Sequence, residues 1–118
     1  MAKILVVDDA QFLRVRISKM LQADGHEVIE AENGVIAVQS YKANKPAIVL
    51  MDITMPEMDG LTALKEIRAY DPNAKVVMLT ALGQESVVLE AIKSGAKDFV
   101  VKPFERERVM RAINKLVG

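Results

Sequence analysis

Short apolar runs alternate with segments of helical periodicity along the whole chain, and this alternation restricts the fold more than any other feature. Four runs, at residues 4–7, 47–51, 76–79 and 99–101, are continuously apolar, which is typical of strands buried on both faces of a parallel sheet. A more polar segment at residues 27–31 fits a strand at the edge of the sheet. Alternating strands and helices predict an α/β domain with right-handed crossovers and helices on both faces.

A stripe of apolar residues at helical spacing follows each predicted strand and indicates a helix there. The stripes are Leu13/Ile17/Met20/Leu21, Ala37/Val38/Tyr41, Leu61/Leu64/Ile67, Val88/Leu89/Ala91/Ile92 and Val109/Ala112/Ile113/Leu116. Five strand–helix units favour an open, doubly wound sheet, because a closed barrel of eight units needs about 250 residues. We therefore expect one domain over residues 1–118, with no separate output domain.

The composition excludes several classes of function. Sixteen basic and sixteen acidic residues cancel, so nothing favours charge-driven binding to nucleic acid or to a membrane surface. The chain has no cysteine, which excludes disulfides, thiolate metal sites and cysteine nucleophiles. No apolar run approaches the roughly 20 residues of a membrane span. The apolar stretch before Asp8 is too short for a signal peptide, so we expect a cytoplasmic protein.

Polar residues stand at the ends of four of the predicted strands. Asp8 and Asp9 follow the first strand, Asp52 the third, Thr80 the fourth and Lys102 the fifth. The carboxyl ends of strands in an open α/β sheet form the edge where ligands bind, so we expect a site there. An aspartate at a strand end is equally typical of a helix cap or a turn, and Asp52 by itself does not separate these interpretations.

A group of carboxylates needs positive charge nearby. Carboxylates held close together in a partly desolvated cleft repel each other by roughly 1 kcal/mol or more per pair. Lys102 and a divalent cation are the two candidates for the compensating charge. Oxygen ligands without cysteine or clustered histidine favour Mg²⁺ over zinc.

These residues resemble the motifs of the receiver domain of response regulators. The segments that carry the resemblance, in family order and spacing, are Asp8-Asp9, Asp52, Met55-Pro56, Asp59-Gly60, Thr80-Ala81 and Lys102-Pro103-Phe104. The resemblance covers essentially the whole chain and implies a flavodoxin-like strand order, 2-1-3-4-5. That order places the first strand beside the third. Lys102 would then lie about two strand spacings of ~4.8 Å from Asp52.

The resemblance also implies a chemistry for the site. Asp52 would be the nucleophile that takes a phosphoryl group from a phosphohistidine of a histidine kinase. Asp9, Asp52 and the backbone carbonyl of Thr54 would hold Mg²⁺, and Asp8 would place its water ligands. Lys102 would supply further positive charge, and its bond to Pro103 would be a cis peptide.

The phosphoryl group would be bound by residues on the fourth strand. The resemblance implies that the Thr80 hydroxyl binds a phosphoryl oxygen, with help from the backbone N–H groups of Thr54 and Ala81. Thr80 and Phe99 would then move together as the switch that reports phosphorylation. A phenylalanine on a strand is more often an ordinary core residue, so the sequence leaves both interpretations of Phe99 open.

The signal would leave through the fourth helix, the fifth strand and the fifth helix. Residues 84–118 hold seven basic and five acidic side chains, which suits a short amphipathic acidic peptide as partner. Residues 81–84 and the expected single-domain build resemble those of the single-domain chemotaxis regulators. The target of these regulators is the flagellar motor switch protein. We therefore expect a monomeric signalling protein rather than an enzyme. Its expected partners are a histidine kinase, the flagellar motor switch protein or another target, and a phosphatase.

Other functions fit the pattern less well. A phosphorelay intermediate or another stand-alone regulator is the main alternative within the family. A haloacid dehalogenase-type phosphatase needs a second aspartate where Thr54 stands, and a flavin carrier needs a phosphate-binding loop after the first strand. Gly34 follows Asn33 in a turn without a P-loop pattern. His26, the only histidine, is expected in a solvated loop.

Overall fold

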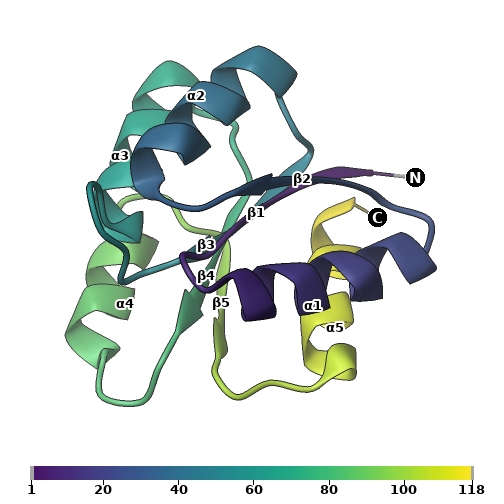
Figure 1. Cartoon of the computed structure of the whole chain (residues 1–118). Helices are drawn as coiled ribbons and strands as arrows, with labels where there is room; N and C mark the ends of the chain where they lie inside the picture. Colours follow the sequence, from purple (N-terminus) through teal and green to yellow (C-terminus); the bar gives the residue numbers. More distant parts are fainter. Residues whose placement is uncertain (1, 118) are drawn as a thin grey trace.

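A computed structural model describes residues 2–117 as a parallel sheet of five strands between two layers of helices (Figure 1). The strands are β1 (Lys3–Val7), β2 (Glu27–Ala31), β3 (Ile48–Asp52), β4 (Val76–Thr80) and β5 (Asp98–Val101). The helices are α1 (Gln11–Ala23), α2 (Gly34–Asn44), α3 (Gly60–Tyr70), α4 (Glu85–Lys93) and α5 (Arg106–Val117). The predicted α/β alternation is confirmed, with bounds that differ by one or two residues.

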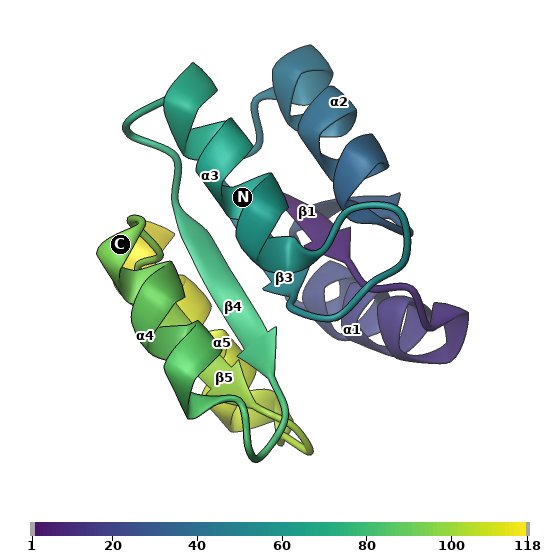
Figure 2. The same cartoon turned by 90° about the vertical axis from the view of Figure 1, so that its left-hand side faces the viewer.

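The strand order is β2-β1-β3-β4-β5, and every pair is parallel. Figure 2 views the molecule from the side on which the β3–α3 loop and the β4–α4 loop lie. In the register, Met51 of β3 lies between Val7 of β1 and Met78 of β4. The strands therefore end at similar heights, and the residues that follow them emerge along one edge of the sheet.

The two faces of the sheet carry separate apolar cores. Helices α2, α3 and α4 cover one face and pack on side chains such as Leu5 and Met51. Helices α1 and α5 cover the other face and pack on neighbours such as Val6 and Leu50. Successive residues of a strand point to opposite faces. Residues 4–7, 48–51 and 76–79 of β1, β3 and β4 are therefore apolar without interruption, because both faces of the sheet are buried there.

His26 departs from the sequence prediction. The turn between α1 and β2 packs against the start of β1, so this histidine is only 8% exposed. Its Nδ1 atom accepts a hydrogen bond from the backbone N–H of Ala2 at 3.3 Å. His26 is therefore a buried residue at the end of the sheet opposite to the aspartates.

None of the helices within residues 2–117 is long and apolar enough to cross a membrane.

Candidate functional site

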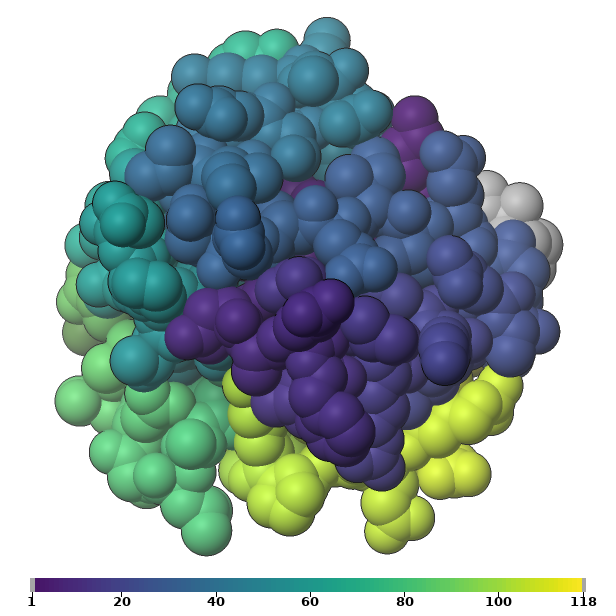
Figure 3. Space-filling view, in the orientation of Figure 1, coloured from purple at the N-terminus to yellow at the C-terminus, as the bar shows by residue number. Residues whose placement is uncertain are grey.

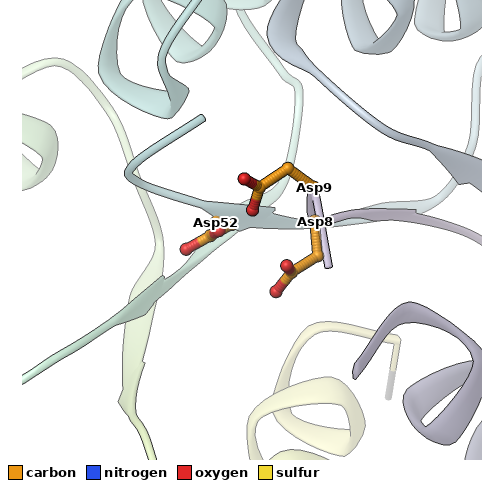
Figure 4. Close-up of side chains that lie close together, drawn as sticks. All are labelled: Asp8, Asp9 and Asp52. Carbon is orange, nitrogen blue, oxygen red and sulfur yellow. The ribbon is translucent and has the colours of Figure 1, made fainter. Parts of the chain in front are cut away.

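Three carboxylates meet where β1 and β3 end (Figure 4). Asp8 and Asp9 directly follow β1, and Asp52 is the last residue of the neighbouring strand β3. One oxygen from each of the three side chains lies within 4.8 Å of the others. Asp8 and Asp52 are buried, whereas Asp9 is exposed. The strand order thus assembles an acidic cluster that opens to solvent on the side of Asp9.

Lys102 reaches this cluster from the end of the edge strand β5. Its Nζ atom donates to Oδ2 of Asp8 at 3.0 Å and to Oδ1 of Asp52 at 3.1 Å. Lys102 follows β5, which is separated from β3 by β4, so the extended side chain spans the distance that the strand order requires. The Lys102–Pro103 peptide bond is cis, as the resemblance implies.

Burial and neighbouring charges shift the pKa values of Asp52 and Lys102. Burial first, and then the negative charge of Asp8, raise the pKa of Asp52 to about 6, although the ammonium group of Lys102 acts in the opposite direction. Burial lowers the pKa of Lys102, but its hydrogen bond to Asp8 and the charge of Asp52 outweigh that effect and leave the pKa raised. At neutral pH, Asp52 and Lys102 are therefore both largely ionised.

The donor set fits a hard divalent cation. Three carboxylates facing one ammonium group leave two negative charges without compensation. The nearby Arg14 does not supply the missing positive charge, because its guanidinium group contacts the backbone carbonyl of Asp8 and pairs with Glu30. Both oxygens of Asp8 already accept hydrogen bonds, from Lys102 and from the N–H of Ala10. Oxygens of Asp9 and Asp52 are thus the more available ligands for Mg²⁺.

The loop between β3 and α3 frames the other side of the site, and it excludes one interpretation of Asp52, that of a helix cap. The side chain that caps α3 is Asp59, whose Oδ1 accepts from the N–H of Thr62 at 2.8 Å. Asp52 is therefore not a helix cap. Ile53 is buried in the core beneath the loop, whereas Thr54 is exposed beside Asp52. In Figure 3 this teal loop lies between the purple start of α1 and the green α4.

The end of β4 contains a contact that sequence reasoning missed. Thr80 is buried, and its hydroxyl lies 3.0 Å from Oε1 of Gln84 and 3.2 Å from the backbone carbonyl oxygen of Ala81. The same Oε1 accepts the N–H of Ala81 at 2.7 Å, and Nε2 of Gln84 donates to the Thr54 hydroxyl at 3.0 Å. In the sequence, Gln84 stood out only as part of residues 81–84, and nothing pointed to this contact, because Thr54 lies thirty residues away along the chain.

Phe99 is not a core residue. It lies on β5 and is 38% exposed, so the interpretation as ordinary core packing is wrong. Its ring lines an apolar groove between α4 and β5. Val88, Leu89 and Ile92 of α4 line the same groove, which extends to Thr80 and Gln84. The surface groove and the carboxyl end of β4 are therefore in direct contact.

Comparison with known proteins agrees with this geometry. Residues 4–114 match the model of the response regulator receiver domain. The chain is 57% identical to the chemotaxis protein CheY of Bacillus subtilis, covering 98% of each chain. It is 54% identical to CheY of Thermotoga maritima, covering 97% of this chain and 96% of the relative.

Solved structures show the same fold. One is a CheX-CheY-BeF3-Mg+2 complex from Borrelia burgdorferi, with a TM-score of 0.92 and 38% identity over 98% of this chain and 89% of that one. A receiver domain protein from Clostridium thermocellum superimposes with a TM-score of 0.95 at 31% identity, covering 99% and 94% of the two chains. The chain belongs to the response regulator receiver domain family.

Proposed function

We propose that this protein is a chemotaxis response regulator that accepts a phosphoryl group on Asp52 from a histidine kinase, in a reaction that depends on Mg²⁺. The observation that carries the proposal is the position of Lys102, whose Nζ atom contacts both Asp8 and Asp52 in the cluster that these residues form with Asp9. A carboxylate held among charged groups at a sheet edge, in a cluster that opens to solvent at Asp9, is suited to accept a phosphoryl group. The receiver family and the chemotaxis relatives support the same assignment.

We assign the metal ligands from the hydrogen bonds of the carboxylates. Asp9 and Asp52 would bind Mg²⁺ directly, with the backbone carbonyl of Thr54 as a third ligand from the protein. Asp8 would contact the ion through water, because both of its oxygens already accept hydrogen bonds. When bound, the ion supplies positive charge that offsets the approach of an anionic phosphoryl group to anionic side chains.

The proposed step exchanges one bond to phosphorus for another. An oxygen of Asp52 forms a bond to phosphorus while the bond from phosphorus to the imidazole nitrogen breaks, and that nitrogen keeps the electron pair. Asp52 is mostly in its nucleophilic, ionised form at neutral pH, since its pKa is about 6. Lys102 already contacts Asp52 at 3.1 Å and is placed to contact an oxygen of the transferred group.

The transferred group would be bound on its other side by donors from two loops. The hydroxyl of Thr80 and the N–H groups of Ala81 and Thr54 are the candidates, because they surround the end of β4 and the exposed side of the β3–α3 loop. Donors that converge on developing negative charge are the main means by which proteins assist phosphoryl transfer.

Phosphorylation with a small-molecule donor tests the proposal. Incubation with acetyl phosphate and Mg²⁺ is expected to add one phosphoryl group to the protein, seen by intact-mass spectrometry. Peptide mapping after borohydride reduction of the acyl phosphate is expected to place it on Asp52. Chelation of Mg²⁺ with EDTA should prevent the reaction. Absence of the adduct, or an adduct on another residue, would contradict the proposal.

We further propose that phosphorylation controls binding of the flagellar motor switch protein at the face formed by α4, β5 and α5. The chemotaxis relatives support the pathway, and the groove between α4 and β5 supports the location. Phe99 and Val101 of this groove also line a neighbouring pocket that contains the basic residues Arg108 and Arg111, which suits an amphipathic acidic peptide. A phosphatase partner, a monomeric state and a cytoplasmic location belong to the same proposal and follow from the resemblance.

Alanine at both Val88 and Phe99 is expected to weaken binding of the motor switch protein by at least about tenfold, because buried apolar anchors carry most of the energy of such contacts. Isothermal titration calorimetry with the phosphorylated protein measures the change. Labelling by acetyl phosphate should persist, since neither residue belongs to the acidic cluster. Phe12→Ala is the matched control, because Phe12 is a 74% exposed phenylalanine on α1. Equal affinities of wild type and double variant would contradict the assigned face.

A further inference from the structure

The Gln84 side chain occupies the groups that the proposed function assigns to phosphoryl binding. Its Oε1 atom is 3.0 Å from the Thr80 hydroxyl and 2.7 Å from the backbone nitrogen of Ala81. Its Nε2 atom donates to the hydroxyl of Thr54 at 3.0 Å. One side-chain amide thus connects the β3–α3 loop to the β4–α4 loop across the open side of the site.

The carbonyl oxygen of an amide and a phosphoryl oxygen are both hydrogen-bond acceptors, so they compete for the same donors. The N–H of Ala81 has a single proton, and so has the hydroxyl of Thr80. Whichever acceptor holds these protons excludes the other. A phosphoryl group that takes them must therefore displace Gln84 or bind with fewer donors.

Displacement of Gln84 would also affect the output face. Gln84 is the N-cap residue of α4, and it follows Gly83, whose φ of 90° lies in the region that favours glycine. No heavy atom lies within 4 Å of a Cβ placed on Gly83, so the segment before α4 has space to move. Gln84 and the Val88 of the next helical turn line the same groove as Phe99.

We propose that Gln84 is a positioning residue that holds the receiver domain in its unphosphorylated state by competing with the phosphoryl group for Thr80 and Ala81. This inference rests on the proposed function, because that function assigns the two donors to phosphoryl binding. The exposed position of Phe99 is consistent with a domain in which Thr80 is held by Gln84. Removal of the amide frees the N–H of Ala81 and leaves the Thr80 hydroxyl only its longer contact of 3.2 Å to the Ala81 carbonyl, which raises the fraction of protein that is ready to bind the phosphoryl group.

Beryllofluoride with Mg²⁺, a stable mimic of the aspartyl phosphate, provides the test. Gln84→Ala is expected to bind it about tenfold more tightly than the wild type, which corresponds to roughly one net hydrogen bond that no longer has to be broken. Isothermal titration calorimetry in the presence of excess Mg²⁺ measures the affinity. Gln39→Ala is the matched control, because Gln39 is an exposed glutamine on α2, away from the site, and its affinity should equal that of the wild type.

A double-mutant cycle with Thr80→Ala shows whether the gain passes through the proposed contact. Without the hydroxyl, Oε1 of Gln84 accepts only the N–H of Ala81, so Gln84→Ala should improve affinity by about threefold instead of about tenfold. A general change in the stability of the loop would produce equal gains in both backgrounds. Equal gains would therefore contradict the proposed competition.

Amide resonances provide a second measurement that does not depend on ligand binding. In the metal-free protein, Gln84→Ala should shift the Ala81 amide proton in a ¹H–¹⁵N NMR spectrum, because its acceptor is lost. An unshifted resonance would contradict the contact.

The outcomes separate this inference from the proposed function. If the wild type binds beryllofluoride and Gln84→Ala binds it equally or more weakly, the role of Gln84 is wrong while the phosphoryl site stands. If neither protein binds beryllofluoride with Mg²⁺, the proposed function itself is contradicted, and the inference with it.

Discussion

An Asp52→Asn variant is expected to incorporate no phosphoryl group from acetyl phosphate and yet, without Mg²⁺, to be more stable than the wild type by about 1–2 kcal/mol at pH 8. Loss of labelling follows because an amide oxygen is not a nucleophile for phosphorus under these conditions. The gain in stability follows because asparagine removes a buried negative charge that lies within 4.8 Å of oxygens of Asp8 and Asp9. Inactivity and added stability together exclude misfolding as the cause of the lost activity.

The gain in stability should depend on pH. Folding raises the pKa of Asp52 from 3.8 to about 6, so the folded state holds this proton more tightly than the unfolded state. Deprotonation of Asp52 therefore costs free energy of folding as pH rises from about 4 to above 6, and the full cost is present at pH 8. As the pH falls towards and below 4, the carboxyl group becomes protonated in both states and resembles asparagine, so the stability difference between variant and wild type should close.

Urea denaturation in EDTA across pH 4–8 measures this gap. Glu66→Gln is the matched control, because Glu66 is an exposed carboxylate on α3, and its effect on stability should be small at every pH. Addition of Mg²⁺ should narrow the gap, since a bound cation favours the ionised wild type. A variant that is less stable than the wild type at pH 8, or a gap that widens on acidification, would contradict the electrostatic account.

Gly60→Ala is expected to reduce the free energy of unfolding by at least about 3 kcal/mol, because overpacking against backbone cannot be relieved by a change of rotamer. A Cβ atom on Gly60 would overlap the backbone carbonyl oxygen of Asp52 and would also approach Cα of Ile53. The N–H of Gly60 donates to the carbonyl of Ile53 at 2.7 Å, which holds the start of α3 against the end of β3. The substitution should therefore also displace Asp52 and slow its phosphorylation.

Gly83→Ala provides the contrast for this prediction. Gly83 has a φ of 90° but open space around its Cα, so alanine there meets backbone strain without a clash and should cost about 1–2 kcal/mol. Chemical denaturation of the two variants compares a steric clash with conformational strain in the same protein. A Gly60→Ala variant that is no less stable than Gly83→Ala would show that the α3 start can move away from β3.

Much of the site could be predicted because its residues stand at strand ends. Continuous apolar runs identified β1, β3, β4 and β5, and a parallel sheet brings the ends of its strands to one edge. Hydrophobic patterning alone does not specify which strands are neighbours, so the closeness of Asp8 to Asp52 depended on the family resemblance. The strand order in the structure confirms it.

Contacts between loops were beyond sequence reasoning. No periodic or compositional signal marks the contacts of Gln84. One of them is with Thr54, which a separate loop brings within hydrogen-bond distance. The buried position of His26 likewise arises because its turn packs on the start of β1. Side-chain contacts between loops depend on how distant segments of the chain pack together, and the local residue pattern carries little information about that packing.

The sequence by itself determined the alternation of strands and helices, the edge of the sheet at which polar residues gather, and the acidic character of the site. These follow from hydrophobic periodicity and from the geometry of parallel strands, which act over a few residues at a time. The tertiary structure alone decided that Asp59 rather than Asp52 caps α3, that Lys102 contacts Asp8 as well as Asp52, and that Gln84 holds Thr80. Each of these depends on distances between segments far apart in the chain, which are set by packing of the whole domain.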